Sequence, residues 1–149
     1  MEQLIFDSGI KEYQINGKGV LRFNPSDPNV YARFMDSMEK IRKVEQDMVA
    51  KANALNRESS IAGEEVLAIM RETDQKMKAI LNGIFGHEND FDKILENVNL
   101  MAVASNGERV VTNLIAALQP IMEAGAKSCV GAEVNEAKLN REQRRAMNR

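Results

Sequence analysis

The densest group of side chains that could do acid–base or metal chemistry lies in the segment FGHENDFD, Phe85 to Asp92. It contains His87, the only histidine of the chain, together with three acidic residues. An imidazole beside carboxylates can act as a general acid or base, or it can ligate a metal. Because no second histidine supports such a site, we interpret the segment as a helix end, a polar loop and a new helix capped by Asn89 or Asp90.

Cys129 is the only cysteine, so the chain cannot form an internal disulfide. A nucleophilic thiol needs a nearby base, and the single histidine lies far away in the sequence, so we expect a small buried or half-buried thiol. The glycines of GKG, residues 17–19, fall within a predicted hairpin rather than between a strand and a helix, which argues against a phosphate loop. We therefore predict a protein that is not an enzyme, with no catalytic residue, no cofactor and no metal site.

The end of the chain differs in charge from the rest. Residues 138–149, KLNREQRRAMNR, carry five basic groups and one acid, a net charge of +4, so the other 137 residues sum to −6. In a helix, Arg141, Arg144 and Arg145 would share one face and could meet an acidic partner. No aromatic residue accompanies them to stack on bases, and the overall charge of −2 gives no general attraction to nucleic acid or membranes.

Methionine is frequent, with nine residues in 149. Five of them fall on apolar helical stripes, and methionine can either fill a core that is poor in aromatic residues or form an adaptable surface for partner helices. The core interpretation is favoured, and the partner surface is kept as an alternative. The candidate partner-binding residues are therefore the three arginines above and Met38, Met48, Met70 and Met77.

A β-hairpin is expected to precede the helices. Leu4–Phe6, Ile10–Ile15 and Val20–Phe23 have strand character, and Asn16-Gly17 is a strong hairpin turn signal because both residues tolerate positive φ. A loop of two residues and a loop of four both fit the pattern, so the register stays open. A unit this small needs a helix to cover its apolar face, and we expect the helix that follows directly to hold it.

Four helices are predicted after the hairpin. The first begins with Asp27 as N-cap and Pro28 in its first position, and its apolar stripe extends over roughly 25 to 28 residues. The second is capped by Ser59 or Ser60 and ends at Gly86. The third is short, with its inward side chains at Phe91, Ile94, Leu95 and Val98. The fourth carries the apolar residues between Val110 and Met122 and is expected to bend or end near Pro120.

These elements predict an α+β, mostly α fold in one globular domain over residues 1–132. The hairpin spans about residues 4–23 and the bundle of about four helices spans about 28–126, while 133–149 form a basic tail that is mobile or a short helix. The chain contains no run of 18 or more apolar residues, the length that a membrane-spanning helix needs. The start, MEQLIFDSG, carries acids where a secretory signal would be basic, so we expect a cytoplasmic protein.

Several of these segments resemble tail assembly chaperones of long-tailed bacteriophages and prophages. The resemblance begins with the INGK turn and with RFNPSDPNVYARF, which leads into the first long helix. It continues through ILNGIFGHENDFDKILENVNLMA and VVTNLIAALQPIM to the basic ending NREQRRAMNR. The most specific part is the NPSDP cap followed by FMDSMEKI.

The resemblance implies a non-enzymatic role in phage tail assembly in the cytoplasm of a bacterial host. Such chaperones coat the helical tape measure protein and keep it soluble until subunits of the tail tube protein polymerise around it. Family members are small, mostly helical and self-associating, which implies a homo-oligomer. The alternative is a small phage-type regulator or inhibitor that binds a host protein or nucleic acid through the basic tail.

Overall fold

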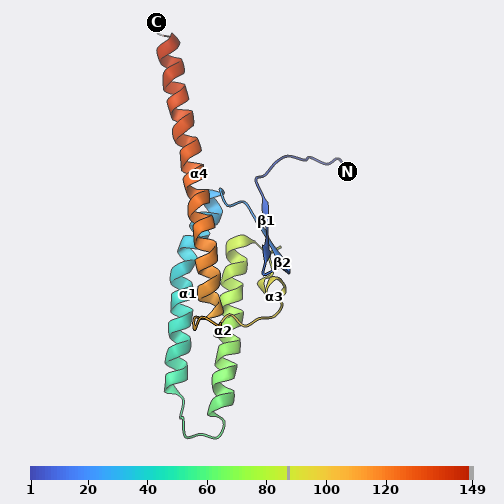
Figure 1. Cartoon of the computed structure of the whole chain (residues 1–149), viewed down its shortest axis with the longest axis vertical. Coiled ribbons are helices and arrows are strands. Elements are labelled where there is room, and N and C mark those ends of the chain that lie inside the picture. The colour runs from blue at the N-terminus through green and yellow to red at the C-terminus, as the bar shows by residue number, and fades with distance from the viewer. Residues whose placement is uncertain (87, 148–149) are drawn as a thin grey trace.

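The computed structural model describes residues 1–86 and 88–147 of the chain. Its elements, in order, are β1 (Lys11–Ile15), β2 (Gly19–Phe23), α1 (Pro28–Ala54), α2 (Ala62–Phe85), α3 (Phe91–Ile94) and α4 (Val110–Met147). Helices α1 and α2 form an antiparallel pair, α4 lies alongside part of that pair, and the two-stranded hairpin stands to one side (Figure 1). The predicted fold class, α+β and mostly helical with an N-terminal hairpin, is confirmed.

The hairpin turn follows the sequence signal. Asn16 and Gly17 both have positive φ, 51° and 75°, as the predicted type I′ turn requires. The Lys18 N–H donates to the Ile15 carbonyl at 3.1 Å, and the strands pair from Ile15 with Gly19 to Lys11 with Phe23. Three residues therefore separate the paired ends, a length between the two that the sequence left open.

The first helix begins and ends as predicted. The Asp27 side chain accepts from the Asn29 N–H at 2.9 Å, and Pro28 occupies the first turn, where its missing N–H has no intrahelical partner to lose. In α2 the cap differs in detail, because Ile61 holds the N-cap position while the Ser59 hydroxyl accepts from its N–H. Gly86 ends α2 with a φ of 98°, as expected.

The last helix corrects two predictions. Instead of ending near residue 126 and leaving a mobile or short-helical tail, α4 continues through Pro120 to Met147 and projects beyond the rest of the molecule (Figure 1). Packing holds it past the proline, because Met122 is fully buried and Gly125 lies against Pro25. Further along, the sequence is rich in Ala, Glu, Lys and Arg, which favour a helix.

The N-terminal residues also depart from the prediction. Residues 1–10 form no strand, and β1 begins only at Lys11. Leu4, Ile5 and Phe6 are 88%, 85% and 75% exposed. Their apolar, β-prone character is real, but no neighbouring strand within the described residues pairs with them. We call residues 1–10 the N-terminal arm.

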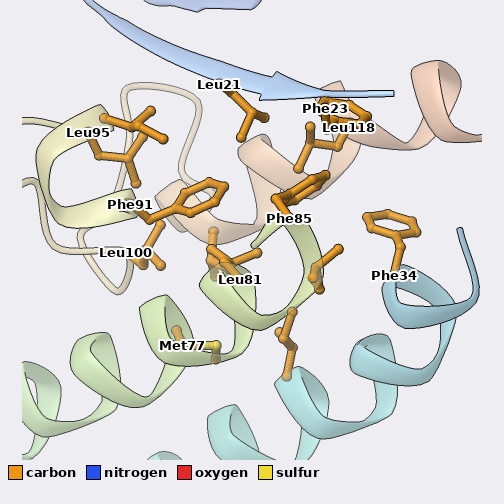
Figure 2. Close-up of a cluster of buried hydrophobic side chains, with 14 of the residues drawn as sticks. Leu21, Phe23, Phe34, Met77, Leu81, Phe85, Phe91, Leu95, Leu100 and Leu118 are labelled. Carbon is orange, nitrogen blue, oxygen red and sulfur yellow. The ribbon is translucent and has the colours of Figure 1, made fainter. Parts of the chain in front are cut away.

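The core lies where the hairpin meets the helices (Figure 2). Leu21 and Phe23 face Phe85, Phe91 and Leu118, and the ring centroids of Phe23 and Phe85 are 4.7 Å apart. The expectation that the first helix mainly holds the hairpin is therefore wrong. The end of α2, α3 and α4 supply most of this cover, because the chain after α2 returns to β2.

Asn89 completes this attachment. Its Oδ1 accepts from the Arg22 N–H at 2.9 Å, and its Nδ2 donates to the Arg22 carbonyl at 2.8 Å and to the Phe85 carbonyl at 2.9 Å. The Asn89 side chain thus satisfies the two Arg22 backbone groups that a third strand would otherwise pair with along the outer edge of β2. Asp90 rather than Asn89 caps α3. Val98, which was predicted to face inward, is 44% exposed.

Candidate partner-binding surfaces

The four methionines proposed as partner contacts divide into two groups. Met48 and Met77 belong to the core, where Met77 has no exposed surface. Met38 and Met70 are half-buried and pack against the same core. Because both side chains are buried, the first pair offers almost no surface to a partner in this fold. Only Met38 and Met70 keep part of their surface accessible.

The three arginines lie on the projecting part of α4. Arg141 and Arg145 are exposed and, four residues apart, lie on one helix face. Arg144 lies on the same helical backbone, and its side chain is outside the described part of the structure. The arrangement presents positive charge on a helix that stands clear of the domain, rather than on a separate tail.

The segment that first suggested chemistry performs structural work where it is described. His87 itself lies outside the described residues. Asn89 attaches β2, Asp90 caps α3 and Asp92 pairs with Lys78. Among residues 1–86 and 88–147, no group of three or more His, Cys, Asp or Glu side chains is placed to hold a metal ion. Cys129 is half-buried on α4.

A buried ion cluster, which no sequence pattern indicates, joins α2 to the chain that follows it. The Lys78 ammonium lies 2.9 Å from Asp74 Oδ2 and 2.6 Å from Asp92 Oδ1. Burial lowers the pKa of Lys78, but its hydrogen bonds to Asp92 and Asp74 outweigh that effect, so the pKa lies above its ordinary value of 10.5. Asp74 Oδ1 also accepts from the Leu100 N–H at 2.7 Å, which fixes the segment leading to α4.

The segment between α3 and α4 crosses the α1–α2 pair, and beyond it α4 no longer covers these two helices. Leu100 bonds to Asp74 on α2, and Arg109 lies 3.4 Å from Glu45 on α1. From this level α4 runs toward the hairpin end of the molecule, and the other ends of α1 and α2 extend past it in the opposite direction (Figure 1). Over that length the two helices have mainly each other to pack against.

The side chains that continue the covered face form the first candidate surface. Two of them lie four and seven residues after Glu45 on α1, and two lie four and seven residues before Asp74 on α2, spacings that keep them on the same helix faces. We call them the distal seam: Val49, Ala52, Leu67 and Met70. Val49 and Leu67 are 43% and 57% exposed, while Ala52 and Met70 are half-buried. By these spacings the seam lies on the faces of α1 and α2 that carry Glu45 and Asp74, beyond the level at which Arg109 and Leu100 contact those two residues.

The second candidate surface is a groove between the hairpin and α4, with a volume of about 510 Å³. Its floor consists of buried leucines, Leu21, Leu95 and Leu118. Its walls carry half-buried apolar side chains from both elements: Tyr13, Ile15, Leu114 and Ile121. We call it the hairpin groove. Sequence patterns could not indicate it, because it joins residues about one hundred positions apart.

None of the helices within the described residues is both long enough and apolar enough to cross a bilayer. Comparison of the chain with models of known protein families, with curated proteins and with solved structures finds no match.

Proposed function

We propose that the protein is a non-enzymatic phage tail assembly chaperone, which works in the cytoplasm of the bacterial host. It binds the tape measure protein and keeps it soluble until subunits of the tail tube protein polymerise around it. The observation that carries the proposal is the distal seam, an apolar strip on a helix pair that lacks the third helix covering it elsewhere. The resemblance of the NPSDP segment and later motifs to such chaperones supports the same function.

The seam suits an amphipathic helix as its ligand. A client helix laid between α1 and α2 would continue the line of α4 and complete a three-helix arrangement, with its apolar side chains against Val49 and Leu67. Met70 adds a flexible side chain that can adapt to different client residues. Full burial of an exposed leucine contributes roughly 1.5–3 kcal/mol, so a few such contacts give binding that tube assembly can reverse.

The test is co-expression with the tape measure protein from the same genome, scored by the fraction of that protein that stays soluble. We expect the native chain to keep it soluble and to co-purify with it. Leu67→Lys and Val49→Lys place a charge in the seam, and because both side chains are exposed in the free protein, the fold is expected to remain intact. Each substitution should weaken client binding roughly 10-fold or more.

Val20→Lys is the matched control, because it removes an apolar side chain on the hairpin that is as exposed as Val49 and lies away from the seam. It should leave client binding unchanged. Equal loss in Val20→Lys and Leu67→Lys would show that general surface hydrophobicity, rather than the seam, holds the client. Normal solubilisation by Leu67→Lys and Val49→Lys would refute the seam as the binding site.

One observation favours a second function. Arg141 and Arg145 stand exposed on the projecting part of α4, as a regulator that docks on an acidic host protein or a nucleic acid would require. Deleting residues 138–149 separates the two functions. A chaperone acting through the seam should keep most of its client binding after the deletion, whereas a regulator acting through the arginines should lose its partner.

A further inference from the structure

The N-terminal arm carries an apolar segment that its own domain leaves exposed. Leu4 and Phe6 are 88% and 75% exposed, and the arm leads away from the hairpin into solvent (Figure 1). In an extended chain, residues two apart point to the same side, so Leu4 and Phe6 form one apolar face and Ile5 points the other way.

The base of the arm is held in place. The Asn24 Nδ2 donates to the Ser8 carbonyl at 3.0 Å, and the Gly9 N–H donates to Asp7 Oδ1 at 2.8 Å. Gly9 has a φ of +75°, and a Cβ there would lie 2.7 Å from Asn24 Nδ2. The positive φ and the close approach of Asn24 therefore require glycine at this position. The hydrogen bond between Asn24 and Ser8 directs the rest of the arm away from its own β1.

One edge of the hairpin is open to receive a strand. The Asn89 side chain forms hydrogen bonds with both the N–H and the carbonyl of Arg22, so these backbone groups of Arg22 point away from β1. Its ladder partner is Glu12, and such pairs alternate along antiparallel strands. The backbone groups of Glu12 and Gln14 consequently point away from β2, and no hydrogen bond within the described residues reaches them.

The hairpin groove lies beside this open edge. Gln14 belongs to its lining together with Tyr13 and Ile15, and α4 forms the opposite wall. A strand that pairs with the edge at Gln14 can therefore turn alternate side chains into the groove. Its volume of about 510 Å³ is within the range of sites that take a few large apolar groups.

We propose that the N-terminal arm of one copy adds as a strand to β1 of a second copy, with Leu4 and Phe6 in that copy's hairpin groove. The occupant is a second copy because the arm cannot return to its own β1 without reversing direction within Ser8–Ile10, where the contacts to Asn24 hold it. Strand exchange of this kind pairs the open backbone groups of the sheet edge and, at the same time, buries the exposed apolar side chains of the arm.

The areas involved favour a reciprocal dimer. A phenylalanine buries about 150–250 Å². Burying a leucine contributes roughly 1.5–3 kcal/mol, which at about 25 cal/mol per Å² corresponds to roughly 100 Å². With a similar area on the groove walls, one arm removes roughly 600 Å² from solvent, below the ~1,200–2,000 Å² of a stable interface. Two arms exchanged between two copies reach the lower end of that range, so the dimer should dissociate on dilution.

Sedimentation velocity over a concentration series of the full chain tests the proposal. The native chain should shift from monomer to dimer as concentration rises. The double variant Leu4→Asp/Phe6→Asp should weaken dimerisation roughly 30-fold or more, because each exchanged arm loses two apolar contacts. Ile5→Asp is the matched arm control and should dimerise nearly as the native chain does, because Ile5 points away from the groove.

The groove side has its own pair of variants. Ala117→Arg blocks the groove from an exposed position on α4, and it should also weaken dimerisation, whereas the neighbouring Ala116→Arg should not. Mixing Ala117→Arg with Leu4→Asp/Phe6→Asp restores one intact arm and one intact groove, so a weak 1:1 complex should form. Circular dichroism checks that each variant folds. If Ala117→Arg does not fold, the comparison of Leu4→Asp/Phe6→Asp with Ile5→Asp tests the proposal alone.

Three results would overturn the proposal. The first is a native chain that stays monomeric at every concentration. The second is equal dimerisation by Leu4→Asp/Phe6→Asp and the native chain, or equal loss in that variant and Ile5→Asp. The third is a monomer whose stability falls when Leu4 and Phe6 are changed, which would mean that the arm fills its own groove. None of these results bears on client binding at the distal seam, which shares no residue with the groove.

Discussion

Replacing Lys78 by Met should destabilise the protein far more than removing its exposed partner Asp92 does. The Lys78 ammonium is buried between Asp74 and Asp92, at 2.9 Å and 2.6 Å. Methionine keeps the length and apolar stem of the side chain but removes the charge. Asp74, whose side chain is only 12% exposed, would then hold an unpaired negative charge in the core.

The expected loss in the free energy of unfolding is about 3–5 kcal/mol, the usual result of removing one partner from a buried pair. Asp92→Ala should cost only about 0–1 kcal/mol, because its side chain is 58% exposed and water can replace much of the interaction. The double variant Asp74→Asn/Lys78→Met removes both buried charges, and its amide oxygen can still accept from the Leu100 N–H. It should recover most of the loss caused by Lys78→Met alone.

Urea unfolding followed by circular dichroism, at concentrations low enough to keep the chain monomeric, measures all of these variants. The diagnostic quantity is the ranking, with Lys78→Met the least stable, the double variant intermediate and Asp92→Ala close to the native chain. A loss below about 1 kcal/mol for Lys78→Met, or a double variant no more stable than that single one, would refute the argument that the buried charge needs its partner.

Two further predictions concern the glycines of α4 and alkaline pH. Gly125→Ala should cost about 1–3 kcal/mol in urea unfolding, because its Cβ would clash with the Pro25 carbonyl oxygen. Gly131→Ala, with nothing within 4 Å of its Cβ, should gain up to about 1 kcal/mol. Equal effects of the two substitutions would contradict the close approach at Gly125. The pKa of Lys78 is raised above 10.5, so its ion pairs stabilise the fold fully below that pH and are lost as the pH rises through the folded-state value. The urea midpoint of the native chain should therefore fall more steeply above about pH 10.5 than that of Asp74→Asn/Lys78→Met, and parallel curves would show that Lys78 is not responsible.

Local signals in the sequence predicted the elements where the deciding interaction is itself local. Asp27 and Pro28 start α1, and Asn16 and Gly17 make the hairpin turn, because each acts on a backbone group no more than a few residues away. Gly86 ends α2 for the same reason. These features depend on φ, ψ and the nearest hydrogen bonds, so neighbouring residues carry enough information to place them.

The features that failed to show in the sequence depend on contacts between distant segments. Asn89 has the sequence context of a helix cap, yet its amide bonds Arg22, 67 residues away. Lys78 interrupts the apolar pattern of α2 and would be placed on its solvent face, but Asp74 and Asp92 neutralise it in the core. From the sequence alone, such residues are expected to be exposed or to bond their near neighbours, because their partners lie in other elements of the fold.

Gly125 explains why the length of α4 was underestimated. A glycine and a proline in one apolar stretch are usually signs of a helix end. Here the missing side chain of Gly125 allows α4 to approach the Pro25 backbone closely, so tertiary packing supports the helix where its own propensity is weakest. The candidate surfaces were out of reach for a related reason, because both the groove and the seam join residues from separate elements.

The two proposed surfaces have a joint consequence. The hairpin groove and the distal seam share no residue and lie toward opposite ends of the α1–α2 pair. Under the two proposals, copies joined through their arms would leave every seam open. A long, repetitive client helix could then occupy both seams of a dimer at once, and the second contact would form at the high effective concentration that linkage provides. Weak single contacts would hold the client firmly as a set, and dissociation of the arms would release it.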